Sequence, residues 1–416
     1  MACLYLNDKR IFNHLIFCIL LILNCLLLLW FIAQTSIYSQ EAIRFFHFQD
    51  SHANLGREFS AAFCYKLAFI GVSIVQWLGI HAIYNDFGLR APFLLLHICN
   101  CVLLYIIALK MLRKAQDSLL CVGIFMLIPG ISVSALVVSN TSVLIFLSLL
   151  IIYWQVIHNR IAYPLFVVAI FLDSGGSILC LALFFYALYY RKNKTIIFAI
   201  LCFGINMYLF APIYGVPKSY FLDTIGFLAI IFTPVFFVYY CAYLYFYTLH
   251  NTPSFVNVIA FIGFIFVLLL SIRQPIKADS FIPFLVVGIP VFVDKMQTEL
   301  RVRLPQFRIK YLIRIGCIAS FLIFGNIILF GNKLTYYFSN EHNFAYPFYA
   351  AKEIAKELYA KNITHIQVEG NLGIRLAFYG INTDSTAPYQ LIQIRNGNIN
   401  IVYGKHTVAQ YGIIRQ

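Results

Sequence analysis

Charged side chains gather in a short stretch that directly follows the first long apolar run. Residues 39–50 read SQEAIRFFHFQD and contain Glu41, Arg44 and Asp50, whereas the preceding run, LIFCILLILNCLLLLWFIA, carries no charge. A carboxylate can remove a proton from a nucleophile, and an arginine can hold a phosphate through paired hydrogen bonds. The stretch therefore combines two groups that a transfer reaction would need.

The composition indicates what kind of protein must position these side chains. Of the 416 residues, 62% are hydrophobic and 11% are charged, whereas a soluble domain carries about 25% charge. Apolar runs of about 20 residues, each long enough to cross a bilayer, recur along most of the chain. This pattern predicts an all-α polytopic membrane protein.

Basic residues mark the loops that are expected on one side of the membrane. Half of the 30 Lys and Arg fall in clusters between apolar runs, at Lys9–Arg10, Lys110–Lys114, Arg160, Arg191–Lys194 and Lys295–Arg314. The positive-inside rule places these loops in the cytoplasm. The net charge of +14 is therefore a topology signal and does not indicate nucleic-acid binding.

Alternating these loops across the bilayer predicts about eleven transmembrane helices, a cytoplasmic N-terminus and a periplasmic C-terminus. The predicted ranges are 13–33, 89–110, 117–138, 141–157, a hairpin of two short helices within 161–190, 195–212, 222–248, 254–272, 279–294 and 311–331. The first run is interpreted as a retained helix, because it is too long for a signal peptide and lacks a small-residue cleavage site.

Two regions do not follow the pattern of the predicted spans: one loop inside the transmembrane module, which spans residues 1–331, and the segment that follows this module. The loop 34–88 is expected on the outer face, where residues 66–80 would form a helix in the membrane interface rather than a span. Residues 332–416 have the pattern of a small extracytoplasmic α/β domain. Its predicted elements are an amphipathic helix at 346–362 with Lys and Glu on its exposed face, a strand at 364–370 and a β-hairpin at 389–404.

Carboxylates and cations map together to the outer face in this topology. The acidic residues are Glu41, Asp50, Glu58, Asp86, Asp173, Asp223 and Asp279. The basic residues are Arg44, Arg57, Lys66, Arg90, Lys218, Arg273 and Lys277. Weakly paired loop charges explain any single residue. The whole set, concentrated in the longest outer loop, favours a site that binds a phosphate and activates a hydroxyl or amine.

Several short motifs resemble the C-fold (GT-C) glycosyltransferases, specifically the family 39 group of protein mannosyltransferases and lipid A aminoarabinose transferases. SQEAIRFF at 39–46 is similar to the acidic pair and alanine that follow helix 1 in that family, with Gln40 in the place of Asp. Further along the chain, YKLAF supplies Lys66 where the family has a lysine.

Two later segments extend the resemblance over about residues 10–190. QWLGIHAIYNDFGLRAP at 76–92 resembles the tryptophan-bearing helix end, the Asn-Asp turn and the arginine at the start of helix 2, here Arg90. VSNTSVLIFLSLLIIYW at 138–154 is similar to helix 4, with Asn140 where the family has Asp.

The resemblance implies transfer of a sugar, with inversion, from a polyprenyl-phosphate donor to a lipid, glycan or protein acceptor. The reaction would take place at the outer face of the bacterial inner membrane. Because Gln40 cannot accept a proton, the catalytic base would be Glu41 or Asp50. The resemblance makes Lys66 and Arg90 ligands of the donor phosphate, and the same loop adds Arg44 and Arg57 as candidates.

The remaining candidate residues carry weaker signals. Asp86, Asp173 and Asp223 are candidates for the wall of an acceptor pocket, although Asp173 in FLDSGGSI also suits a simple turn. His52 with a neighbouring carboxylate could hold a divalent cation, whereas an exposed histidine is the simpler interpretation. The eleven cysteines are scattered through apolar runs and suggest neither disulfides nor a metal site.

Rival functions from other classes stay open. A transporter or lipid flippase would need ionisable groups deep within helices or paired broken helices, and the predicted helix interiors are almost free of charge. A non-enzymatic membrane assembly protein, with a tail domain that binds a partner, is compatible with the loss of an acidic residue at Gln40. The sequence has no P-loop, no GxGxxG after a strand and no GxSxG.

Overall fold

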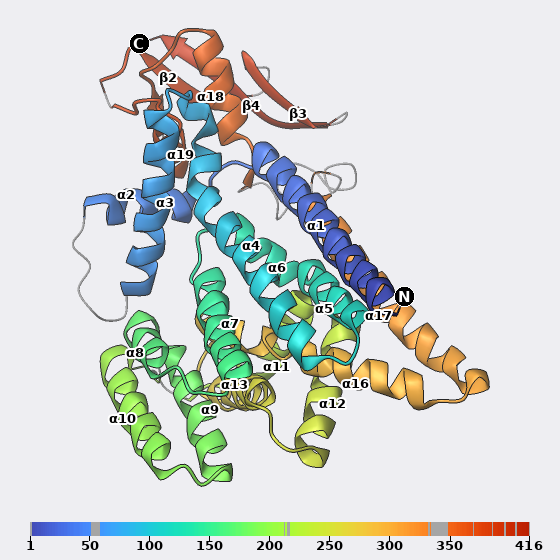
Figure 1. The fold of residues 1–416 in the computed structure, drawn as a ribbon. Coiled ribbons are helices and arrows are strands. Elements are labelled where there is room, and N and C mark those ends of the chain that lie inside the picture. Colours follow the sequence, from blue (N-terminus) through green and yellow to red (C-terminus); the bar gives the residue numbers. More distant parts are fainter. Residues whose placement is uncertain are drawn as a thin grey trace. The chain divides into compact units, whose positions relative to one another are not determined.

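The computed structural model describes residues 2–50, 59–211, 213, 217–331, 333, 348–368, 370–384, 386–394, 397–403 and 406–415. The chain divides into two compact units (Figure 1). Unit 1 comprises Met1–Cys25, Ala53–Ala61 and Phe93–Asn326. Unit 2 comprises Leu26–His52, Ala62–Pro92 and Ile327–Gln416.

Unit 1 is built of helices. It contains most of α1 (Ala2–Gln34), α4 (Asn85–Met111) and α17 (Arg308–Phe330), and all of α5 (Ala115–Leu127), α6 (Pro129–Leu136), α7 (Thr141–His158), α8 (Tyr163–Leu172), α9 (Gly176–Tyr189), α10 (Asn193–Phe210), α11 (Phe221–Phe232), α12 (Pro234–His250), α13 (Phe255–Ser271), α14 (Ala278–Phe281), α15 (Pro283–Val286), α16 (Ile289–Val302) and the short 3₁₀ helix η2 (Pro305–Phe307).

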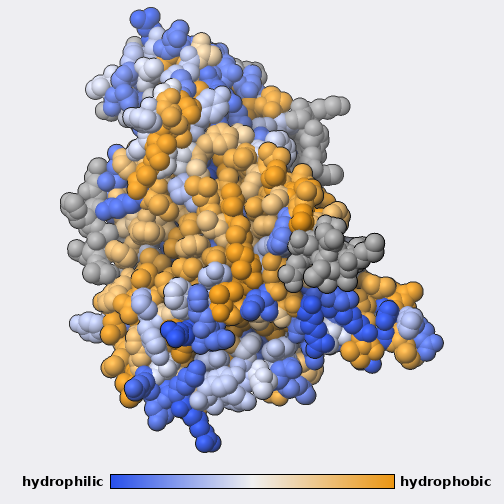
Figure 2. Space-filling model, viewed as in Figure 1, coloured by the Kyte–Doolittle hydropathy of each residue, from blue (hydrophilic) through white to orange (hydrophobic). Residues whose placement is uncertain are grey.

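The lengths and compositions of these helices confirm a multi-pass helical membrane protein. The described residues include seven helices that are long and apolar enough to cross a bilayer, or nine if each of two bent pairs counts as one span. Three further apolar helices, α8, α9 and α13, are shorter. Large apolar side chains cover much of the visible surface (Figure 2), as expected for helices that face lipid rather than water.

Two ranges that the sequence predicts as single helices are sharply bent at a break, and a third, 279–294, is divided among α14, α15 and the start of α16. The range 117–138 divides into α5 and α6, which are bent by 63°, and the range 222–248 divides into α11 and α12, which are bent by 104°. The prediction of one helix in each range is wrong because Pro129 and Pro234 cannot donate the backbone hydrogen bond that would continue the helix. Thr233, at the sharper bend, has a φ of +66°.

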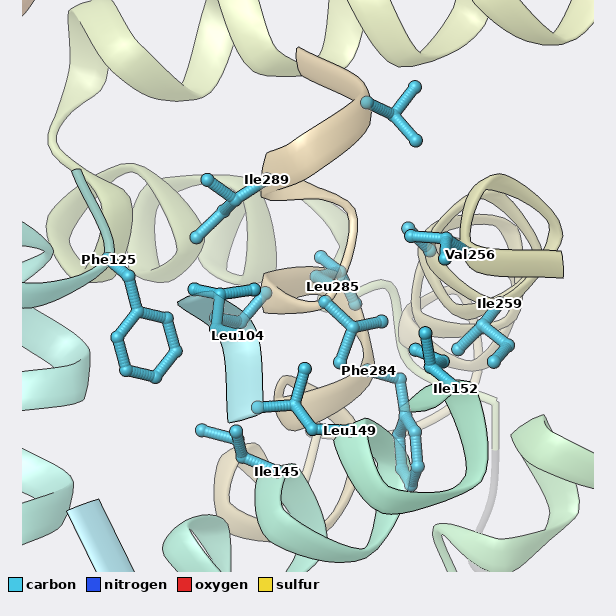
Figure 3. Close-up of a cluster of buried hydrophobic side chains, with 14 of the residues drawn as sticks. Leu104, Phe125, Ile145, Leu149, Ile152, Val256, Ile259, Phe284, Leu285 and Ile289 are labelled. Atoms are coloured by element: carbon cyan, nitrogen blue, oxygen red, sulfur yellow. The ribbon is translucent and has the colours of Figure 1, made fainter. Parts of the chain in front are cut away.

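The core of unit 1 lies where α4, α5, α7, α13, α15 and α16 meet. Figure 3 shows Leu104, Ile145, Leu149 and Phe284 with their neighbours in this cluster, and all four are buried. Since membrane helices gain little from hydrophobic burial against lipid, close packing of such side chains holds the bundle together.

The predicted helical hairpin within 161–190 is confirmed. Helices α8 and α9 are separated by Asp173, Ser174 and Gly175. A side chain at Gly175 would clash with the carbonyl oxygen of Ser280, so only glycine lets the turn approach α14 this closely.

Unit 2 contains α2 (Ser39–Asp50), most of α3 (Phe59–Trp77), the 3₁₀ helix η1 (Ala82–Tyr84), the start of α4, and a C-terminal α/β part. The C-terminal elements are α18 (Ala351–Ala360), β1 (Gln367–Val368), α19 (Asn371–Phe378), β2 (Tyr389–Gln393), β3 (Ile399–Tyr403) and β4 (His406–Arg415). By length and composition α3 qualifies as a span, so its placement in the interface stays a prediction.

The sheet differs from the predicted hairpin. Its strand order is β1-β2-β4-β3, so β4 lies between β2 and β3 and pairs antiparallel with both. The predicted pairing of β2 with β3 in a hairpin is therefore wrong, because β4, a strand that the sequence analysis did not predict, lies between them. β1 pairs parallel with β2 at the other edge.

Candidate functional site

Helix α2, which carries the charged stretch, packs against α3 and α19 in unit 2. Ala42, Phe45 and Phe48 recur at helical spacing and are buried. The Phe48 ring stacks on Tyr65 of α3 at a centroid distance of 5.7 Å, and Phe45 meets the edge of Phe378 of α19 at 5.4 Å. These contacts fix the rotation of α2 and therefore the direction of its charged side chains.

The structure brings the predicted base and two predicted phosphate ligands onto these two neighbouring helices. Glu41 is only 4% exposed, and its charge acts on the Tyr65 hydroxyl. The positive charge of Arg44, one turn further along α2, acts on the same hydroxyl. Lys66 follows Tyr65 on α3, and its side chain is exposed. A carboxylate, a guanidinium and an ammonium group thus lie on one pair of helices.

Arg90 lies in the same unit but directs its donors into the protein. Its Nη1 donates to Thr35 Oγ1 at 2.7 Å, and its two terminal nitrogens also reach the carbonyl oxygens of Thr35 and Ser36. The side chain is buried, and its Nε has no hydrogen-bond partner among the described residues. Arg90 therefore holds the connection between α1 and α2, which positions Glu41.

Asp86 forms a buried ion pair with a residue of the C-terminal part. Its Oδ2 lies 2.9 Å from Lys352 Nζ, and both of its oxygens accept from the Tyr379 hydroxyl at 3.0 Å. Burial raises the pKa of the Tyr379 phenol, and the Asp86 carboxylate raises it further, so the phenol stays a donor. That hydroxyl also accepts from the Ile37 backbone N–H.

Arg375 of α19 completes this network, which we call the Asp86 network (Asp86, Lys352, Arg375 and Tyr379). It donates from Nε to the Ile37 carbonyl and from Nη2 to Ser36 Oγ and the Tyr349 carbonyl, at 2.7–2.8 Å. The network ties the C-terminal α/β part to residues 33–38 and to the start of α4. This contact was not predicted, because the periodicity of 346–362 placed Lys352 on the exposed face of its helix, whereas Lys352 is buried.

In unit 1 a second group of side chains converges on the predicted candidate Asp173, and we call it the Asp173 hub (Ser60, Asn140, Asp173 and Ser280). Asn140 was named from the resemblance, whereas Ser60 and Ser280 were not predicted. Asp173 Oδ2 accepts from Ser60 Oγ at 2.8 Å, Asn140 Nδ2 at 3.1 Å and Ser280 Oγ at 3.3 Å. Its Oδ1 accepts from the Gly175 N–H at 2.8 Å. No Lys or Arg among the described residues forms an ion pair with Asp173, which is 3% exposed.

The hub joins the turn between α8 and α9 to three other parts of unit 1. Ser60 comes from the start of α3, Asn140 precedes α7, and Ser280 belongs to α14. Asn206 of α10 closes the end of α8 by donating to the carbonyl oxygens of Ile170 and Asp173. The Asp173 carboxylate in the turn between α8 and α9 thus accepts hydrogen bonds from neutral donors of several different segments.

The remaining candidate residues belong to none of these groups. Asp223 is exposed at the start of α11. Arg57 and His52 lie outside the described residues, as does the side chain of Asp50, although α2 extends to that position. Within the described part of the chain no three His, Cys, Asp or Glu side chains are grouped so that they could hold a metal ion.

Comparison with known proteins adds no further assignment. No protein-family model matches the chain, and no curated protein matches it.

Proposed function

We propose that this chain is an integral-membrane glycosyltransferase of the GT-C type, with about eleven spans, that moves a sugar from a polyprenyl phosphate to an acceptor at the outer membrane face. One observation carries the proposal: Glu41, Arg44 and Lys66 lie on the neighbouring helices α2 and α3. A transfer from a lipid phosphate needs a carboxylate and cations together.

Glu41 is the proposed base. The acceptor oxygen or nitrogen attacks the anomeric carbon, the bond from that carbon to the phosphate oxygen breaks, and the acceptor proton passes to Glu41. Polyprenyl phosphate leaves with the bonding electrons.

Lys66 and Arg44 are the proposed ligands of the departing phosphate. Lys66 supplies a mobile point charge from an exposed position, and Arg44 supplies a planar set of donors. Arg90 contributes by holding the connection between α1 and α2 rather than by direct contact, because its terminal donors bind Thr35 and Ser36.

The experiment is transfer of a radiolabelled sugar from polyprenyl-phosphate donors by the purified full-length protein in proteoliposomes. The donor and acceptor are first identified by comparing glycolipids and glycoproteins of strains with and without the gene. We expect Glu41→Gln to lower kcat by about 10²–10⁴-fold. Full activity of Glu41→Gln would remove the base assignment, and unchanged glycan profiles in the deletion strain would contradict an enzyme.

Lys66 offers a control that separates chemistry from folding. Because Lys66 is exposed, Lys66→Ala should leave the thermal stability unchanged while raising KM for the donor, and Lys66→Arg should recover part of that loss. Gln40→Ala is the matched variant on α2, since Gln40 is exposed beside Glu41 and has no proposed role. It should retain full activity.

A transporter or flippase for a lipid-linked glycan is the second candidate, and the broken helices favour it. Two spans are bent sharply at a break, and the buried Asp173 lies in the turn of the short α8–α9 hairpin inside unit 1. Transporters place such interruptions at their binding sites. Movement of a fluorescent polyprenyl-linked sugar across proteoliposomes, abolished in Asp173→Asn, would establish this function instead of transfer.

A further inference from the structure

The turn between α16 and α17 is exposed along an unbroken stretch, residues 302–310, which we call the basic elbow. Its sequence is VRLPQFRIK, and all nine residues are exposed. The elbow precedes α17, which is long and apolar enough to cross a bilayer. Its side chains are therefore placed where a spanning helix meets the membrane surface.

Three cations of the basic elbow have no acidic partner among the described residues. They are Arg303, Arg308 and Lys310. Arg303 lies over the ring of Tyr311, and Arg308 Nε donates to the Arg303 carbonyl at 2.9 Å, so both contacts are with uncharged groups.

Two carboxylates near the elbow are already paired with other arginines. Asp117 forms an ion pair with Arg301, and Glu299 lies 3.6 Å from Arg314. The Tyr243 hydroxyl bridges the second pair, donating to Glu299 at 2.7 Å and accepting from Arg314 at 2.8 Å. The positive charge of the elbow is therefore not neutralised from within this part of the chain.

Large apolar side chains alternate with these cations. Val302, Leu304, Phe307 and Ile309 are 53–77% exposed. Figure 2 shows hydrophobic and hydrophilic side chains mixed at the corner where α16 meets α17, at the lower right of both views. In water such a surface would be unfavourable, whereas at a bilayer surface the apolar groups enter the acyl boundary and the cations reach phosphates.

We propose that the basic elbow binds the headgroups of anionic phospholipids. Charge complementarity identifies the ligand: three unneutralised cations beside a spanning helix fit lipid phosphates, and the interleaved apolar side chains fit the attached acyl chains. Free phosphate would satisfy the cations but would leave the four apolar side chains in water.

The test measures binding of phosphatidylglycerol and phosphatidylcholine to the delipidated full-length protein by native mass spectrometry. Each cation near an anionic surface contributes about fivefold in affinity, so Arg303→Gln/Arg308→Gln/Lys310→Gln should weaken phosphatidylglycerol binding by roughly 100-fold at low salt. Binding of phosphatidylcholine should not change. High salt should reduce the difference between the two proteins, because exposed charges are screened.

Two control variants distinguish a specific site from net charge and from misfolding. Lys356→Gln/Lys361→Gln/Arg415→Gln removes three exposed cations from the C-terminal part and should leave lipid binding unchanged. Arg303→Lys/Arg308→Lys keeps the charge of the elbow and should retain most of the affinity.

Three outcomes would overturn the proposal. The first is a triple elbow variant that still prefers phosphatidylglycerol, and the second is an equal loss in the C-terminal control. The third is competition by glycerol phosphate: if it displaces bound phosphatidylglycerol at concentrations as low as those at which unlabelled phosphatidylglycerol does, the site binds free phosphate.

Discussion

Two buried aspartates in this protein are stabilised in opposite ways. Asp86, in unit 2, faces the ammonium group of Lys352 at 2.9 Å and the hydroxyl of Tyr379. Asp173, in unit 1, is surrounded by hydroxyl, amide and backbone donors and has no ion pair among the described residues. One carboxylate depends on a single cation, and the other shares its charge among several neutral groups.

The comparison teaches how each region should tolerate change. Removing the cation of a buried pair leaves a charge without compensation, which costs far more than the pair itself contributes. Removing one of several hydrogen bonds leaves the others in place, so the cost is that of one donor. We therefore expect the Asp86 network to fail sharply and the Asp173 hub to weaken gradually.

The largest expected effect follows from Lys352→Met, which removes the cation and keeps the apolar stem. The buried Asp86 would lose its partner, and we expect a loss of about 3–5 kcal/mol in the free energy of unfolding. The measurement is the apparent melting midpoint of the detergent-purified protein. The double variant Asp86→Leu/Lys352→Met should regain most of the loss, and equal midpoints for Lys352→Met and the parent would contradict the ion pair.

An intermediate effect is expected for Asp173→Asn. The new amide nitrogen would face at least one of the groups that now donate a hydrogen bond to the carboxylate. A buried donor is then left unsatisfied, which lowers the free energy of unfolding by about 1–3 kcal/mol. The same thermal measurement tests this. A stability equal to that of the parent would show that neutral donors do not hold the hub together.

The smallest effects are expected at the serines of the hub. Ser60→Ala should cost about 1 kcal/mol, because Asn140, Ser280 and Gly175 still donate to Asp173. Ser280→Ala should cost less, since its hydrogen bond of 3.3 Å is longer than the 2.8 Å bond of Ser60. If Ser60→Ala lowers the melting midpoint as much as Lys352→Met does, Asp173 and Asp86 do not differ in their tolerance to the loss of one partner.

The elements inside unit 1 were more predictable from sequence than the long-range contacts. Apolar runs and the DSGG turn predicted the short hairpin of α8 and α9, because both depend on residues that are close in the chain. The bends at Pro129 and Pro234 could have been predicted from the prolines themselves. The continuous apolar runs around them led to the prediction of unbroken helices instead.

The candidate sites depend on contacts that no local pattern carries. The helical periodicity of 346–362 placed Lys352 in solvent, since nothing nearby in the sequence reveals Asp86 as its partner. The order of the strands likewise depends on β4, whose pairing with both β2 and β3 is set by the folded sheet. The convergence of Ser60, Asn140 and Ser280 on Asp173 is of the same kind.

The Asp86 network also has a consequence for the order of events during synthesis. Asp86 and Tyr379 are 293 positions apart, so the ribosome presents the carboxylate long before its partners exist. Until the last helices of the chain have been translated, Asp86 must stay hydrated or be held by a chaperone. A nascent chain that stalls before Lys352 would carry an uncompensated charge at the start of α4.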